Sequence, residues 1–332
     1  MADDTKKYKV EDKEILVAVF NKYVWRFMVP KIPRSITPNS ITIFGQFCAL
    51  GGLITAFLAT QGLPLLYVVS GLLWFAYLTA DNLDGQHARA TGQTSVLGEF
   101  LDHGLDGFAS GCVLLTCCIV LGMDGIWMAM MLALGAVGFI VTFWEQYRTG
   151  RLILPEISAA EGVTLVIIVN LLMATMGEPQ WLYFNIETMT GATWLILVVL
   201  VGYAVAIVGP TYRIAKHTGG KIGELLPVLA IGAASCGYVA AGAAAPMPAI
   251  MVSMFAADMV CRMIRLRHQG ESSHIVAPYH WLLVLPLVPA AVGGIWTADG
   301  WAVIAMGMSI VMYGTTLLRS SATIVATAKA EA

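Results

Sequence analysis

The sequence has little charge for its length. Only 12% of its 332 residues are charged, whereas 58% are hydrophobic, and the mean hydropathy is +0.75. This composition excludes a soluble globular protein and predicts a polytopic membrane protein. The net charge is −2, and the basic residues are dispersed over short loops instead of forming a patch. We therefore expect no nucleic-acid partner.

The sequence also shows no sign of disulfides, reactive cysteines or a cleavable signal peptide. All six cysteines fall within apolar runs, so we interpret them as small packing residues rather than as disulfides or reactive thiolates. They are Cys48, Cys112, Cys117, Cys118, Cys236 and Cys261. Residues 1–15 are dense in charge where a signal peptide would need an apolar stretch, so we expect none.

Ten apolar segments follow from residue 37 onward, each near the roughly 20 residues that a bilayer needs. They are 37–60, 63–84, 94–122, 125–147, 158–177, 191–212, 223–243, 246–267, 277–296 and 299–319. Before them, residues 14–30 place apolar side chains at helical spacing, with Lys22 and Arg26 on the other side. This pattern predicts an interfacial amphipathic helix that ends at Pro30 and Pro33.

The expected fold is an all-α integral membrane protein of about ten transmembrane helices, preceded by the amphipathic helix. Residues 1–36 form a cytoplasmic tail with that helix, 37–320 one membrane domain, and 321–332 a short cytoplasmic tail. All 19 Lys and Arg residues lie in the connections of one side or at their borders, and the opposite loops hold only acids, at Asp124, Glu178, Glu187 and Asp299. The positive-inside rule therefore predicts that both termini face the cytoplasm.

Four aspartates at helical spacing are the main candidate site. Asp81 and Asp84 are spaced i, i+3, and Asp102 and Asp106 are spaced i, i+4, so each pair lies on one helix face. Two helices can aim all four carboxylates at one point, where they would repel strongly unless a divalent cation lay between them. Oxygen ligands favour Mg²⁺, Mn²⁺ or Ca²⁺, and a two-ion cluster suits phosphoryl transfer.

A simpler interpretation pairs these acids with Arg89 and His103, but two basic groups do not neutralise four carboxylates. Intramembrane ionisable residues are also functional as a rule. Three small residues, Gly85, Ala88 and Gly98, leave the neighbouring surface bare, so that a flat or bulky ligand can approach the backbone. The sequence therefore favours a metal-dependent site that faces the cytoplasm.

The segment DNLDGQHARATGQTSVLGEFLDHGLD resembles the signature of the CDP-alcohol phosphotransferase family. That signature is Asp-x-x-Asp-Gly-x-x-Ala-Arg, eight residues, Gly, three residues, Asp, three residues, Asp. It is matched by Asp81, Asp84, Gly85, Ala88, Arg89, Gly98, Asp102 and Asp106. Three segments are similar in sequence to the choline and ethanolamine phosphotransferase branch of the family: DNLDG, LGEFLDHGLD, and WEQYRTGRLIL followed by Glu161. The likeness covers about residues 37–177.

The resemblance implies transfer of phosphocholine or phosphoethanolamine from CDP-choline or CDP-ethanolamine to diacylglycerol, with release of CMP. Two Mg²⁺ ions are implied, with Mn²⁺ as a substitute. Asp81, Asp84 and Asp102 would bind one ion, and Asp81, Asp102 and Asp106 the other. Some members of the family instead use CDP-diacylglycerol as the donor and a soluble alcohol as the acceptor. From a different class, a divalent-cation transporter is the remaining alternative, although we find no internal repeat.

Other residues receive roles in this hypothesis. His103 is the candidate general base for the lipid hydroxyl, and its alternative is a supporting partner of the aspartate cluster. Whether His103 or Asp106 accepts the proton stays open. Arg89 would pair with a phosphate or, alternatively, anchor the cytoplasmic interface. Glu161 would orient His103 or the acceptor hydroxyl.

The CDP-alcohol would also contact residues beside the acids. Gly85 and Ala88 would admit the cytidine, and Gly98 would border the bound substrate. Asn39 is part of the helix-start signal TPNSIT, and the resemblance adds a contact with the nucleotide.

Outside this region, Asp258 and His280 are interpreted as hydrogen-bonded structural groups, with Arg262 or a backbone carbonyl as the partner, and a contact with the substrate is the alternative. The small-residue stretch 232–245 predicts close helix packing, within the chain or between the protomers of an expected homodimer. The expected membrane is the endoplasmic reticulum or Golgi in a eukaryote and the inner membrane in a bacterium.

Overall fold

The computed structural model describes residues 9–155, 158–177, 185–186, 189–271, 273–293 and 296–331. The chain folds into two compact units that alternate along the sequence. One unit, here called the acidic unit, consists of Asp12–Gly122, Leu154–Trp181 and Ser321–Ala332. The other, the companion unit, consists of Met1–Glu11, Met123–Ile153 and Leu182–Ser320. The sequence had predicted a single membrane domain over 37–320.

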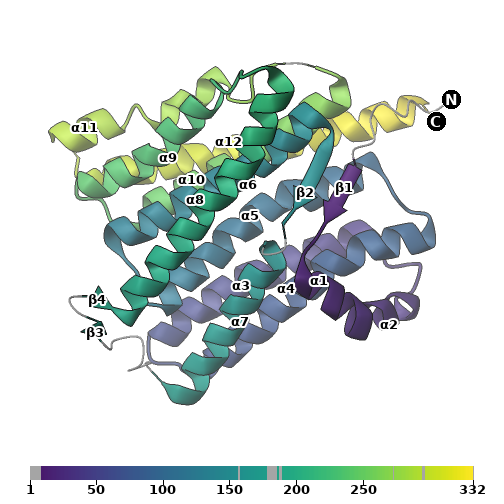
Figure 1. Cartoon of the computed structure of the whole chain (residues 1–332), viewed down its shortest axis with the longest axis horizontal. Helices are drawn as coiled ribbons and strands as arrows, with labels where there is room; N and C mark the ends of the chain where they lie inside the picture. The colour runs from purple at the N-terminus through teal and green to yellow at the C-terminus, as the bar shows by residue number, and fades with distance from the viewer. Residues whose placement is uncertain are drawn as a thin grey trace. The chain divides into compact units, whose positions relative to one another are not determined.

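Four long helices form the body of the acidic unit (Figure 1). They are α3 (Pro38–Thr60), α4 (Leu65–Thr91), α5 (Val96–Val120) and α7 (Ala159–Met176). Helix α3 packs on α4 and α5, and both of these also pack on α7. All four candidate aspartates therefore lie on two helices, α4 and α5, that share α3 and α7 as neighbours.

Local capping residues set the ends of the helices that carry the site. The Thr37 side chain accepts a hydrogen bond from the Ser40 amide and begins α3, and the Ser95 side chain accepts from the Gly98 amide and begins α5. Helix α4 ends at Gly92, whose φ of 71° is left-handed. The predicted end of the second span at residue 84 is therefore too early, because α4 continues to Thr91. The polar residues after Asp84 continue the helix, because its backbone hydrogen bonds need no apolar side chains.

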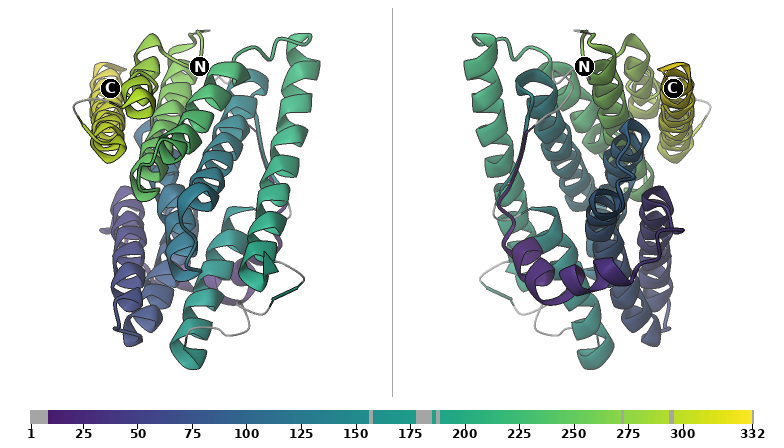
Figure 2. Two further views of the ribbon diagram at one scale, coloured as in Figure 1. Left: turned by 90° about the vertical axis from the view of Figure 1, so that its left-hand side faces the viewer. Right: turned by 90° about the vertical axis from the view of Figure 1, so that its right-hand side faces the viewer.

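The predicted amphipathic helix is confirmed as α1 (Ile15–Phe20), the π-helix η2 (Asn21–Trp25), α2 (Arg26–Met28) and the 3-10 helix η3 (Val29–Lys31). This segment runs crosswise to the long helices of the acidic unit (Figure 2). Trp25 is fully buried in the core with Trp74 and Tyr77. The opposite face is apolar and exposed, at Ile15, Val19, Tyr23 and Phe27.

Two glutamates join the start of this segment to the start of α7. The Glu14 carboxylate accepts a hydrogen bond from the Ala160 amide at 3.0 Å. In the other direction, Glu161 accepts one from the Leu16 amide at 2.9 Å and one from the Ser158 amide at 3.0 Å. Each glutamate therefore satisfies backbone N–H groups at the beginning of the other helix, and Glu161 also caps its own.

The companion unit is also helical. It contains α6 (Gly125–Thr149), α8 (Gly191–Thr218), α9 (Leu225–Ala240), α10 (Pro246–Gln269), η5 (Pro278–Leu283), α11 (Leu287–Val292) and the part of α12 (Ala298–Glu331) up to Ser320. Helix α6 packs against α8, α9 and α10. Two short strand pairs complete the structure: β1 (Lys9–Asp12) with β2 (Arg151–Leu154), and β3 (Asn185–Ile186) with β4 (Met189–Thr190).

Within the residues that the structure describes, seven helices are long and apolar enough to span a membrane: α3, α5, α6, α7, α8, α10 and α12. The chain is an all-α membrane protein. Three of the ten predicted spans have no counterpart among these seven helices. Helix α4 has 27 residues but a polar second half, and α9 has 16 residues. The segment 277–296 is not one helix, because Pro286 lacks the amide hydrogen that would join η5 to α11.

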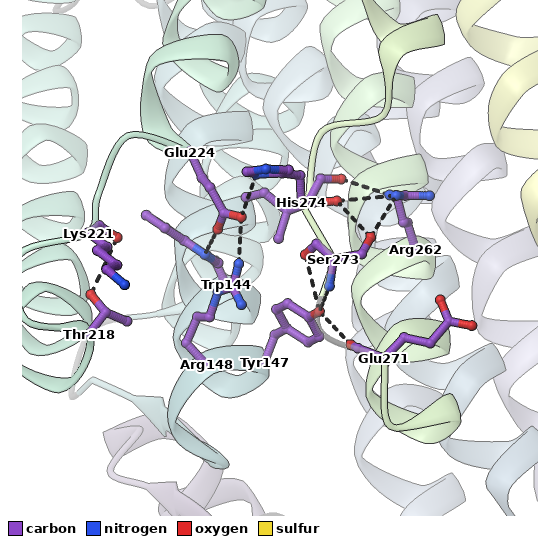
Figure 3. A network of polar contacts seen from close by, with 11 residues as sticks. Trp144, Tyr147, Arg148, Thr218, Lys221, Glu224, Arg262, Glu271, Ser273 and His274 are labelled. Carbon is purple, nitrogen blue, oxygen red and sulfur yellow. Dashed lines mark hydrogen bonds and ion pairs between the residues drawn. The ribbon is translucent and has the colours of Figure 1, made fainter.

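Polar side chains at the end of α6 organise the loops of the companion unit (Figure 3). The Trp144 indole donates to Glu224 at 2.9 Å, Arg148 pairs with the same carboxylate, and His274 lies 3.2 Å from it. The Tyr147 hydroxyl donates to the Glu271 carbonyl at 2.8 Å. The WEQYR segment therefore fastens the loop before α9 and the loop after α10 to one helix end.

A buried pair in the same unit confirms the interpretation of Asp258 and His280 as hydrogen-bonded groups. The His280 Nδ1 accepts from the Ala277 amide at 3.0 Å, so the proton lies on Nε2, which donates to Asp258 at 2.6 Å. Tyr279 donates to the same carboxylate oxygen at 3.2 Å. This pair holds η5 against α10.

Candidate active site

The acidic unit brings the four aspartates together. Asp81 and Asp84 project from α4, and Asp102 and Asp106 from α5. The Asp81 carboxylate interacts electrostatically with the other three and shares a hydrogen bond with Asp106. Like charges at this spacing repel strongly in a medium of low dielectric constant, so the cluster calls for protons or cations between the oxygens.

The tightest ligand group within the described residues consists of Asp102, His103 and Asp106. One potential ligand atom from each lies within 4.8 Å of the others. The His103 Nδ1 is 3.8 Å from an Asp106 oxygen, one turn along α5. Carboxylate oxygens and an imidazole nitrogen are ligands that divalent cations accept, and Asp81 adds a further carboxylate through Asp106. The donor set therefore fits a divalent metal ion.

Asp84 is the most buried of the four acids and has fixed partners. Its side chain is 3% exposed. The Thr42 hydroxyl of α3 donates to one carboxylate oxygen, and the Gly85 amide donates to the other. Asp106 has a similar partner, because the Tyr77 hydroxyl donates to it at 3.4 Å. Thr42 and Tyr77 could not be predicted as partners of these acids, since spacing along one helix does not show which side chains a neighbouring helix contributes.

Arg89 covers the surface that Gly85 leaves bare. A Cβ atom at Gly85 would lie 3.2 Å from the Arg89 Nη1, so the exposed guanidinium folds back over the glycine one turn earlier. Ala88 is buried. The structure therefore gives Gly85 a packing role beside Arg89, and a ligand that reaches its backbone must displace the guanidinium.

Gly98 and Asn39 lie next to each other in the structure. A Cβ atom at Gly98 would be 3.2 Å from the Ser95 hydroxyl and 3.4 Å from the Asn39 side-chain oxygen. The missing side chain thus lets the first turn of α3 approach the first turn of α5 closely. Asn39 is thereby placed at the start of both helices, and its predicted contact with the nucleotide stays a prediction.

Glu161 has a structural explanation. Both of its carboxylate oxygens accept backbone N–H groups, from Leu16 and Ser158. The sequence interpreted this acid as an orienting group for His103 or the acceptor hydroxyl, because a carboxylate at the start of an apolar helix is costly. The two hydrogen bonds account for that cost without a catalytic role.

Comparison with known proteins connects this site to a family. A sequence profile described as CDP-alcohol phosphatidyltransferase matches residues 35–200, which is half of the chain and includes all four aspartates. The chain belongs to this family. The resemblance inferred from the spacing of Asp81, Asp84, Asp102 and Asp106 is therefore confirmed.

Curated relatives in the family include several activities. The chain is 31% identical over 190 residues to the uncharacterized CDP-alcohol phosphatidyltransferase class-I family protein 3 of Dictyostelium discoideum, covering 53% of this chain and 46% of the relative. It is 31% identical over 185 residues to choline/ethanolaminephosphotransferase 2 of Arabidopsis thaliana, covering 53% and 46%. It is 33% identical over 161 residues to the CDP-diacylglycerol–serine O-phosphatidyltransferase of Encephalitozoon cuniculi, covering 46% and 41%. The chain thus spans about half the length of the curated relatives it matches.

Proposed function

We propose that the protein transfers phosphocholine or phosphoethanolamine from its CDP ester to the hydroxyl of diacylglycerol. The observation that carries this proposal is the convergence of Asp81, Asp84, Asp102 and Asp106 within the family's matched region. In this reaction the lipid oxygen forms a bond to the phosphorus next to the alcohol, and the bond from that phosphorus to the oxygen of CMP breaks. CMP leaves, and the hydroxyl proton passes to a base on the protein.

The four aspartates would hold two Mg²⁺ ions, for which Mn²⁺ can substitute. Asp81, Asp84 and Asp102 are assigned to one ion, and Asp81, Asp102 and Asp106 to the other. Bound divalent cations neutralise negative charge that develops on the attacking and leaving oxygens. The buried Asp84, fixed by two hydrogen bonds, would keep its carboxylate in one orientation for such a ligand.

His103 is the proposed acceptor of the lipid proton. Its ring lies beside the aspartate cluster, with Nδ1 3.8 Å from an Asp106 oxygen, and an imidazole is a common general base. Arg89, exposed at the last turn of α4, would bind a phosphate of the nucleotide after moving away from Gly85. Asn39, Gly98 and Ala88 would border the cytidine.

A second candidate reaction uses CDP-diacylglycerol as the donor and a soluble alcohol as the acceptor. The similarity to the serine phosphatidyltransferase of Encephalitozoon cuniculi favours it. Two observations favour the first reaction: the similarity to the choline and ethanolamine phosphotransferases, and the residue sequences DNLDG and DHG at the aspartates. Both reactions release CMP, so the identity of the donor distinguishes them.

The test uses the purified full chain in detergent or in proteoliposomes. Labelled CDP-choline and CDP-ethanolamine are each supplied with diacylglycerol, and CDP-diacylglycerol is supplied with serine in a parallel reaction, with and without Mg²⁺. We expect labelled phosphatidylcholine or phosphatidylethanolamine and CMP only when Mg²⁺ is present. Phosphatidylserine alone would establish the second reaction. Movement of Mg²⁺ across the liposome membrane without CMP from any donor would support a transporter.

The expected setting is a eukaryotic endoplasmic reticulum or Golgi membrane, or a bacterial inner membrane, with the site open to the cytoplasm. The placement of basic residues in the connections of one side supports this orientation. A homodimer is also expected, and cross-linking of the purified protein tests it.

A further inference from the structure

Two buried hydroxyl groups contact the aspartate cluster from outside it. Thr42 lies on α3, is 5% exposed and donates to an oxygen of Asp84. The same hydroxyl lies 3.3 Å from the Pro38 carbonyl. A threonine hydroxyl has one proton, and the charged carboxylate is both the nearer and the stronger acceptor. The proton of Thr42 is therefore directed at Asp84.

Tyr77 makes the corresponding contact to Asp106. It lies on α4, one turn before Asp81, and is 7% exposed. Its hydroxyl donates to an oxygen of Asp106 on α5 at 3.4 Å, and the phenol stands within electrostatic range of Asp81 and Asp102 as well. The Trp74 ring packs edge-on against the tyrosine, with centroids 5.7 Å apart, and so fixes its ring.

Asp84 and Asp106, which accept these hydrogen bonds, are the two acids that are each assigned to only one of the two proposed ions. Asp81 and Asp102 are assigned to both ions, Asp84 only to the first and Asp106 only to the second. Each unshared acid thus accepts a hydroxyl proton from a helix other than its own. A carboxylate rotates freely about its last bond unless a partner fixes it, so such a hydrogen bond decides which oxygen faces the ion.

We propose that Thr42 and Tyr77 are positioning residues that fix the Asp84 and Asp106 carboxylates in the orientation required for binding divalent cations. This inference rests on the proposed function only in that Asp84 and Asp106 are taken as metal ligands. It assigns neither hydroxyl to the substrates. Partners of metal ligands contribute about 10- to 100-fold to metal affinity in general.

The test measures binding of Mn²⁺ alone, without nucleotide or lipid, to the purified full chain in detergent by electron paramagnetic resonance of the free ion. Thr42→Val removes the hydroxyl at nearly constant shape, and Thr42→Ser keeps it. We expect Thr42→Val to weaken the affinity for one ion about tenfold or more and Thr42→Ser to stay within about threefold of wild type. Tyr77→Phe should weaken binding of an ion about threefold to tenfold, since its hydrogen bond is longer.

Thr116→Val is the matched control. Thr116 lies on α5, is fully buried, and donates only to the Cys112 carbonyl one turn earlier at 2.8 Å among its described contacts. Its removal repeats the loss of a buried threonine hydroxyl away from the acids. We expect unchanged Mn²⁺ affinity. If Thr42→Val does not fold, Thr42→Ala removes the same hydroxyl and takes its place.

Turnover gives a second reading. The Mg²⁺ concentration for half-maximal rate should rise in Thr42→Val by the same factor as the Mn²⁺ dissociation constant, and kcat at saturating Mg²⁺ should recover most of its wild-type value. Equal Mn²⁺ affinity in wild type, Thr42→Val and Tyr77→Phe would overturn the positioning roles while leaving the metal site intact. Absence of Mn²⁺ binding by the wild type would refute the metal site itself, and the inference with it.

Discussion

Replacing Glu161 separates a structural role from a catalytic one. In Glu161→Ala, the backbone N–H groups of Leu16 and Ser158 lose their acceptors at 2.9 and 3.0 Å. Both groups lie at helix starts, where no carbonyl of the same helix can replace the lost partner. The structure therefore predicts a less stable acidic unit whose chemistry is intact.

The size of the effect follows from the two hydrogen bonds. Each is made to a charged acceptor in a partly buried place, and loss of a capping acceptor costs about 0.5–2 kcal/mol. We expect Glu161→Ala to lower the free energy of unfolding by about 2–3 kcal/mol in total. For a unit of this size that corresponds to a decrease in Tm of roughly 5–10 °C. Glu161→Gln keeps one oxygen as an acceptor and should lose about half as much.

The assay combines thermal unfolding in detergent with turnover at a temperature well below the lowest Tm. Asp124→Asn serves as the control, because Asp124 is an exposed acidic N-cap on α6 and asparagine caps equally well. We expect kcat of Glu161→Ala to stay within about threefold of wild type. A kcat lowered a hundredfold or more at unchanged Tm would contradict the capping role and restore the interpretation made from the sequence.

Three further predictions concern the site and the topology. Asp84→Asn and Asp106→Asn should each lower turnover at least a hundredfold while the protein stays folded, and a chelator should do the same to the wild type; activity within tenfold of wild type would reject the two-ion assignment. His103→Ala should lower kcat by about a hundred- to ten-thousandfold at saturating Mg²⁺ if His103 accepts the lipid proton, whereas full recovery at high Mg²⁺ would assign it to supporting the cluster. A cysteine at the exposed Lys221 should react with an impermeant thiol reagent only from the cytoplasmic side, and one at Asp124 only from the other.

Hydropathy predicted most helices to within a few residues, because long apolar runs are hard to place anywhere but in a bilayer or a core. It failed where backbone chemistry decides the outcome. Helix α4 continues through the polar residues after Asp84 and ends only at the left-handed Gly92. The predicted span 277–296 is broken, because hydropathy counts the apolar side chains around Pro286 but not the missing amide hydrogen.

Helical spacing in the sequence predicted the part of the site that lies on single helices. Spacing placed Asp81 with Asp84 and Asp102 with Asp106, and the family match followed from it. The contacts of Thr42 and Tyr77 depend on the register between neighbouring helices, which no single-helix pattern contains. The partner of Glu161 could not be predicted for a related reason: the Leu16 amide that donates to it lies 145 residues earlier in the chain.

The alternation of the two units along the chain has a consequence for biosynthesis. Helices α3, α4 and α5 are made before α6 of the companion unit, whereas α7, which supplies Val163 and Val166 to their shared core, is made after it. The helices that carry the four aspartates are therefore synthesised before their unit can form its complete core, because α6 of the other unit is made in between. A chain truncated after Gly122 would therefore contain α3, α4 and α5 without the α7 side chains of their shared core.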